Sequence, residues 1–135
     1  MKKAVIFDMY GVLLRRNIFL REYEDTEMIA LAEELKGKGV QLFLLSNIFV
    51  RKSSYFKKRF GFIKFFNKLY FSSDTGFIKP DPRAFELVLK ENNLKPEDCV
   101  FFDDSEANVA AAQALGIEAY VFVGADAARQ AILRS

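Results

Sequence analysis

Polar side chains of several kinds follow the short apolar runs of this sequence, and together they suit chemistry on a phosphoryl group. They belong to Asp8, Ser46, Asn47, Lys79, Asp103 and Asp104. Three carboxylates held close together repel one another and raise one another's pKa unless positive charge lies among them. The single lysine neutralises only one of the three carboxylates, so this set predicts a divalent cation that offsets the remaining negative charge. Hard oxygen ligands favour Mg²⁺ for this position.

A cation, an ammonium group and hydroxyl and amide donors can together hold the oxygens of a phosphoryl group. A carboxylate beside them is a candidate nucleophile that forms an aspartyl-phosphate intermediate. Taken singly, each of these residues fits a turn, a helix cap or a solvated loop at least as well, so only the joint set favours a site. The chain contains no histidine, which excludes imidazole bases and zinc sites that need a histidine ligand.

Short β-rich runs alternate with helical patterns, and this alternation predicts the elements that position the polar side chains. Strands are expected at residues 4–7, 40–45, 69–72, 100–102 and 118–123, with helices between them that have Asp81 and Ser105 as N-caps. The pattern indicates an α/β fold with three α/β/α layers around a parallel sheet. Because the carboxyl ends of parallel strands form the ligand crevice, the polar side chains are expected to meet there.

The composition of residues 1–135 is that of one globular domain, with 51% hydrophobic and 28% charged residues. The net charge of +2 identifies no partner. No apolar run approaches the roughly 18 residues of a membrane helix, so no membrane partner is expected. The single cysteine, Cys99, cannot form an internal disulfide and suits a cytoplasmic location.

The segment 48–73 is basic and rich in aromatic residues, and it contains no acidic residue. An amphipathic helix with a solvated basic face, followed by core residues, is the favoured interpretation. Nucleic-acid binding is not favoured because the domain as a whole is not strongly basic. Phenylalanines exposed within residues 56–70 would offer a surface for a homo-oligomer.

Four stretches of the chain resemble the four motifs of the haloacid dehalogenase (HAD) superfamily in their usual order. The stretches are FDMYGVL, LLSN, GFIKPDPRAF and FFDDSEANVAAAQALGI. The resemblance runs from about Ala4 to Val123 and implies a Rossmann-like core with a parallel sheet of about five strands. It also implies a Mg²⁺-dependent phosphatase that acts on a phosphate monoester, either a small substrate or a phosphorylated macromolecule.

The resemblance further implies a set of metal ligands. Asp8 would be both the nucleophile and a ligand of Mg²⁺, and Tyr10 would contribute its backbone carbonyl. Asp103 and Asp104 would complete the protein ligands. Asn108 stands where many members of the superfamily carry a further acid that supports the site.

The phosphoryl group has its own implied partners. Ser46 would bind its oxygens with Asn47 nearby, and Lys79 would neutralise charge on the nucleophile and the phosphate. Tyr10 departs from the superfamily's phosphatases, which usually carry an aspartate there as general acid and base. A tyrosine, with an ordinary pKa near about 10, can donate a proton at pH 7 but is a poor base.

Two alternatives follow from Tyr10. The pattern also resembles that of 2-haloacid dehalogenases, in which the same aspartate, here Asp8, displaces halide from carbon without a metal. A weakly active or non-catalytic phosphate-binding protein is the second alternative. Residues 9–24 are too few for an independent core, so they predict a turn or flap in place of a separate cap domain.

Overall fold

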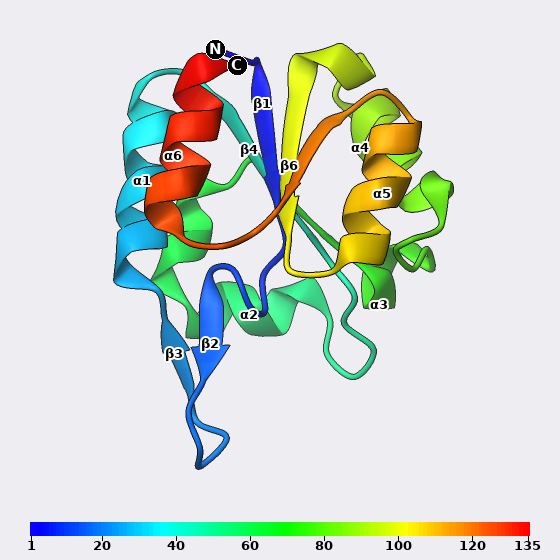
Figure 1. Cartoon of the computed structure of the whole chain (residues 1–135). Helices are drawn as coiled ribbons and strands as arrows, with labels where there is room; N and C mark the ends of the chain where they lie inside the picture. The colour runs from blue at the N-terminus through cyan, green and yellow to red at the C-terminus, as the bar shows by residue number, and fades with distance from the viewer.

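The computed structural model describes all residues, 1–135, and shows a five-stranded parallel sheet between two layers of helices (Figure 1). The strands are β1 (Ala4–Phe7), β4 (Gln41–Ser46), β5 (Lys68–Phe71), β6 (Cys99–Asp103) and β7 (Glu118–Val121). The helices are α1 (Thr26–Gly37), α2 (Ser53–Arg59), α3 (Ser72–Thr75), α4 (Pro82–Glu91), α5 (Glu106–Ala114) and α6 (Ala125–Arg134), with 3₁₀ turns η1 (Gly61–Phe65) and η2 (Pro96–Asp98). The predicted α/β/α fold with five strands is confirmed, and every predicted strand end lies within two residues of the observed one.

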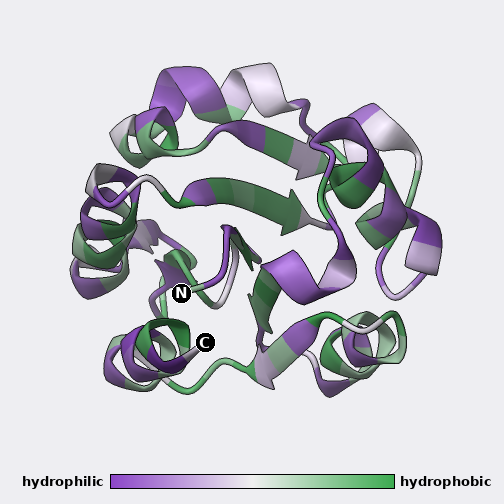
Figure 2. Cartoon of the chain, turned by 90° about the horizontal axis from the view of Figure 1, so that it is seen from above, coloured by the Kyte–Doolittle hydropathy of each residue, from purple (hydrophilic) through white to green (hydrophobic).

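Successive residues of the buried strands face opposite helix layers, which is why these strands are apolar throughout. On β1, Val5 and Phe7 pack into the core beneath α1 and α6, whereas Ala4 and Ile6 pack against α4 and α5. Figure 2 shows the hydrophobic strands between helices whose outward faces are hydrophilic. The two cores fix the sheet firmly between the helix layers.

The strand order β5-β4-β1-β6-β7 places the first strand at the centre of the sheet. Phe7 on β1 lies beside Leu44 on β4 and Phe102 on β6. The residues that follow these positions therefore emerge at the same level of the same sheet edge. The chain adds β4 and β5 on one side of β1 and then β6 and β7 on the other side. Open parallel sheets bind their ligands at the point where the strand order changes side in this way.

The aromatic residues of segment 56–70 are mainly buried, which confirms the favoured interpretation of core residues behind a basic helix face, whereas the alternative of exposed phenylalanines is wrong. Helix α2 ends at Arg59, and the following turn η1 folds the chain back over the sheet. Phe56, Phe60, Phe62 and Phe66 consequently lie buried in the core, each at most 8% exposed. This segment does not offer the exposed aromatic surface on which the homo-oligomer prediction depended.

A hairpin of β2 (Leu14–Arg16) and β3 (Glu22–Glu24) occupies the stretch between β1 and α1. It projects from the end of the molecule at which the sheet strands finish, as does the loop after β4 (Figure 1). The Asn17 carboxamide oxygen accepts hydrogen bonds from the N–H groups of Phe19 and Arg21, which defines the tip. No separate cap domain is inserted here.

None of the helices combines the length and apolar character that crossing a bilayer requires.

Candidate active site

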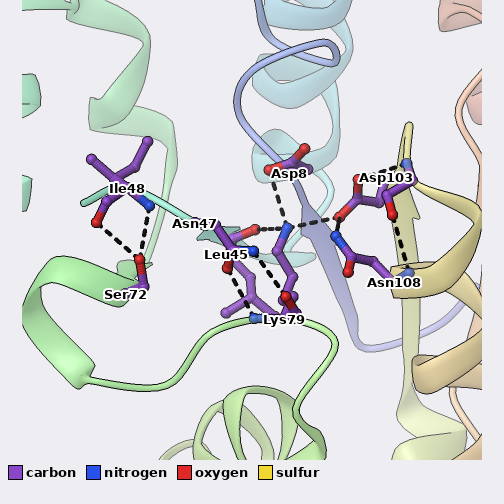
Figure 3. A network of polar contacts seen from close by, with 9 residues as sticks. Asp8, Leu45, Asn47, Ile48, Ser72, Lys79, Asp103 and Asn108 are labelled. Atoms are coloured by element: carbon purple, nitrogen blue, oxygen red, sulfur yellow. Dashed lines mark hydrogen bonds and ion pairs between the residues drawn. The ribbon is translucent and has the colours of Figure 1, made fainter. Parts of the chain in front are cut away.

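Lys79 lies at the centre of the predicted residue set, with its side chain 1% exposed. Its ammonium group donates to Asp8 Oδ1 at 3.1 Å, Asp103 Oδ2 at 2.7 Å and the Leu45 carbonyl at 2.6 Å (Figure 3). All three donor positions are therefore satisfied. A buried ammonium group requires such partners, because charge without them is strongly unfavourable inside a protein.

The loop that carries Lys79 is held in place by Asn47. The Asn47 amide group donates to the Lys79 carbonyl at 2.9 Å, and the Lys79 N–H donates to Asn47 Oδ1 at 2.9 Å. Asp81 then caps α4 by accepting from the Arg83 N–H. Both polar atoms of the Asn47 side chain are thus used for positioning, and its predicted contact with substrate stays a prediction.

Asp103 is oriented by its neighbours on α5. The Ser105 N–H donates to Asp103 Oδ1 at 2.9 Å, and the Asn108 amide group donates to Asp103 Oδ2 at 2.9 Å. Burial by itself would raise the pKa of Asp103, but Lys79 and these hydrogen bonds outweigh it and lower that pKa. Asp103 is therefore held in its ionised form, and Asn108 positions it.

Asp8 and Asp104 complete a cluster of carboxylates. One oxygen each of Asp8, Asp103 and Asp104 lie within 4.8 Å of one another. Burial raises the pKa of Asp8 to about 7, and nearby Asp103 adds to this, although Lys79 opposes it. Burial and Asp103 also raise the pKa of Asp104. A cation among these oxygens would reverse such shifts, so three hard oxygen donors in this arrangement fit Mg²⁺.

Gly11 allows Asp104 to approach the loop after β1. Its backbone has a φ of +84°, in the region that favours glycine, and a Cβ atom there would overlap Oδ2 of Asp104. The glycine is therefore required for two separate reasons. One is the turn itself, and the other is the space that the Asp104 carboxylate occupies.

One pocket of about 270 Å³ brings the predicted site residues together. Its lining includes Asp8, Tyr10, Ser46, Asn47, Lys79, Asp103, Asp104 and Asn108. Ser46 is only 3% exposed, yet its hydroxyl makes no hydrogen bond within the protein. The pocket thus combines an anionic cluster, a buried cation and a hydroxyl group that is free to bind a ligand.

Tyr10 has a partner that sequence reasoning missed. Its hydroxyl donates to Glu22 Oε1 at 2.8 Å, and the Arg16 guanidinium lies 4.6 Å from the centre of its ring. Burial and the hydrogen bond to Glu22 raise the pKa of Tyr10. Glu22 and Arg16 face each other across the hairpin, and nothing in their local sequence marks this pairing with Tyr10.

Comparison with known proteins agrees with the fold. A family model described as haloacid dehalogenase-like hydrolase matches residues 18–116. A phosphorylated carbohydrates phosphatase of Thermotoga maritima is 32% identical over 110 residues, which cover 82% of this chain and 47% of that protein. Sesquiterpene phosphatase astK of Aspergillus oryzae is 33% identical over 93 residues, covering 69% and 47%. The chain spans about half the length of these curated relatives.

The fold is shared with a HAD family enzyme of Bacteroides thetaiotaomicron that was crystallised with magnesium and inorganic phosphate. The TM-score is 0.77 at 21% identity, and the match covers 90% of this chain and 94% of that one. At this identity the likeness concerns the fold alone. The family model, however, covers nearly three quarters of the sequence, from the hairpin to the end of α5. The chain therefore belongs to the haloacid dehalogenase-like hydrolase family.

Proposed function

We propose that this protein is a Mg²⁺-dependent phosphatase that cleaves phosphate monoesters through an aspartyl-phosphate on Asp8. The observation that carries the proposal is the placement of Lys79 between two carboxylates, with a third within 4.8 Å. Ser46 lines the same pocket with a free hydroxyl. This combination offers both a nucleophile and the positive charge that a phosphoryl group requires.

In the first step, a carboxylate oxygen of Asp8 forms a bond to phosphorus as the bond to the ester oxygen breaks. The Ser46 hydroxyl would bind a phosphoryl oxygen during this transfer, and Lys79, bonded to Asp8, would offset the negative charge on the nucleophile and the phosphoryl group. Mg²⁺ bound by Asp8, the Tyr10 carbonyl, Asp103 and Asp104 would offset the negative charge that these groups bring together. Water then attacks phosphorus, which releases phosphate and restores the Asp8 carboxylate.

The second step needs a base, and the pair of Tyr10 and Glu22 can supply one. A tyrosine hydroxyl alone accepts a proton poorly at pH 7. Because the Tyr10 hydroxyl already donates to Glu22 at 2.8 Å, it can receive a proton from water while passing its own to that carboxylate. The leaving oxygen takes its proton from solvent in the first step, and Glu22 returns the proton it received to solvent after the second, which restores both groups. This relay offers a physical role for the residue that departs from the superfamily's usual pattern.

Hydrolysis of a generic aryl phosphate tests the proposal. We expect turnover with Mg²⁺ and its loss in excess EDTA, because three carboxylates around one lysine lack compensating charge without a cation. Full activity in EDTA would contradict the metal requirement. Release of halide from a 2-haloacid in EDTA would instead support the dehalogenase alternative, which Tyr10 favours. Tight binding of a phosphate-mimicking metal fluoride without any turnover would support the non-catalytic alternative.

Replacing Gly11 with alanine tests the position of Asp104. The new methyl group would displace the Asp104 carboxylate, so we expect roughly a tenfold or greater loss of apparent Mg²⁺ affinity. Gly39→Ala is the matched control, since Gly39 has a similar φ of +82° but has nothing near its Cβ position. Both variants should lose stability through backbone strain, and Mg²⁺ titrations of activity should separate them. Equal Mg²⁺ affinities in the two variants would contradict a role for Asp104.

A further inference from the structure

A second and larger groove lies beside the active-site pocket, and the reaction at Asp8 leaves it unused. Its volume is about 530 Å³, against about 270 Å³ for the pocket that holds Asp8. It runs between the Arg16–Glu22 pair of the hairpin, the loop after β4 and the first turn of α2. Tyr10 and Asn47 line both spaces, so the groove opens directly from the catalytic pocket. We call it the side groove.

Most polar groups of the side groove already have partners within the protein. The Tyr10 hydroxyl is bonded to Glu22, and the Arg16 guanidinium lies 3.7 Å from the same carboxylate. Both polar atoms of the Asn47 side chain bond the backbone of Lys79. Apart from the Arg51 guanidinium and the Tyr55 hydroxyl at the outer end of the groove, a leaving group rich in hydroxyls would find few free donors or acceptors here, and burying hydroxyls without partners is unfavourable.

Apolar side chains form the opposite wall. Ile48 and Phe56 are buried, and Tyr55 is partly exposed beside them. Phe49 and Val50 are 69% and 89% exposed, so the packing of this chain does not cover them. Adjacent exposed apolar side chains at the rim of a catalytic pocket are typical of a surface that a ligand covers.

The wall is held in a fixed shape. The Ser72 hydroxyl donates to the Ile48 carbonyl at 2.9 Å and accepts from the Ile48 N–H at 2.9 Å (Figure 3). The Arg51 guanidinium lies 4.5 Å from the centre of the Tyr55 ring. Its flat face therefore extends the aromatic surface of the groove. A groove that is already formed loses little ordering entropy when it binds a ligand.

We infer that the side groove holds the leaving group of the substrate, and that this leaving group is mainly hydrocarbon or aromatic. The inference rests on the proposed phosphatase function and specifies its substrate class. The phosphoryl group would occupy the small polar pocket, with the ester oxygen near Tyr10, while the alcohol extends along Ile48, Phe49 and Tyr55. The two phosphatases reported above are named for a sesquiterpene and for carbohydrates, so their names do not choose between the classes.

Two esters of primary alcohols separate the classes. We expect kcat/KM for n-hexyl phosphate, below its micelle concentration, to exceed that for a hexitol monophosphate by at least about tenfold, because only the alkyl chain gains from leaving water. Equal rates, or faster hydrolysis of the hexitol ester, would overturn the inference. Hydrolysis of an aryl phosphate in the same assay reports the proposed function separately. If neither the aryl phosphate nor either of the two esters is hydrolysed, both the proposed function and the inference are overturned.

A pair of phenylalanine variants locates the effect. Phe49→Ser should reduce kcat/KM for n-hexyl phosphate several-fold more than kcat/KM for the hexitol ester. Phe19→Ser is the matched control, since Phe19 is similarly exposed at 76% but lies at the hairpin tip, outside the groove. Equal effects of the two variants would overturn the inference. A mass measurement in solution tests whether Phe49 instead lies in a dimer interface. If Phe49→Ser dissociates a dimer without changing the ester preference, the inference is also overturned.

Discussion

Replacing Asp8 with asparagine is expected to lower kcat for phosphate release by at least about a thousandfold. An amide oxygen is a far weaker nucleophile than a carboxylate, so no bond to phosphorus forms at this position. The remaining positive charge of Lys79 and the hydroxyl of Ser46 would still bind phosphate. The loss should therefore fall on the chemical step, with a much smaller change in the affinity for inorganic phosphate as a competitive ligand.

The same substitution should not unfold the protein, and this makes its effect on activity interpretable. Burial raises the pKa of Asp8 to about 7, which means that the folded chain disfavours its charge when no cation is bound. A neutral side chain of the same shape is therefore tolerated. Asp126→Asn, at an exposed position in the first turn of α6, is the matched control and should retain both activity and stability.

Acid quenching during turnover provides a direct readout of the intermediate. In the unmodified protein, mass spectrometry should find a phosphoryl group on the peptide that contains Asp8. The Asp8→Asn protein should carry none. Normal turnover by Asp8→Asn would exclude Asp8 as the nucleophile, and a phosphoryl group on another residue would reassign that role.

The site residues that could be predicted from the sequence are those that lie at the ends of the parallel strands. Asp8, Ser46 and Asp103 each follow or end a buried apolar run, and parallel pairing brings such ends to one edge whatever the loops do. The caps Asp81 and Ser105 were equally predictable, because each accepts a hydrogen bond from a backbone N–H in the first turn of its own helix.

Contacts between distant loops could not be predicted in this way. Glu22 reaches the Tyr10 hydroxyl only because the hairpin folds back over the strand end, and its sequence fits a solvated hairpin equally well. Asn47 bonds the backbone of a residue 32 positions further along, a positioning role that its local sequence does not reveal, and its contact with substrate stays a prediction. The sequence of segment 56–70 favours core residues, but it leaves exposed phenylalanines as an alternative, which only the packing of α2 and η1 against the core excludes.

Lys79→Met should destabilise the fold as well as remove activity. The substitution leaves Asp8 and Asp103 buried side by side without the ammonium group that now bonds both. Removing one partner of a buried ionic cluster typically costs about 3–5 kcal/mol, which corresponds to a fall in melting temperature of roughly 10–20 °C for a chain of this size. Lys90→Met, at an exposed position in the last turn of α4, is the matched control and should change the melting temperature little.

The pH dependence of the Lys79→Met effect identifies its cause. Without Lys79, burial and mutual repulsion would raise the folded-state pKa of both carboxyl groups above their unfolded values. Protonation then favours the folded state, so the stability lost by the variant should be smaller near pH 5 and larger near pH 8. Mg²⁺ should recover part of the loss at pH 8, since the cation supplies charge to the same oxygens. Thermal unfolding at the two pH values, with and without Mg²⁺, measures all of this. A loss that is equal at both pH values and indifferent to Mg²⁺ would mean that Lys79 stabilises the fold by packing rather than by its charge.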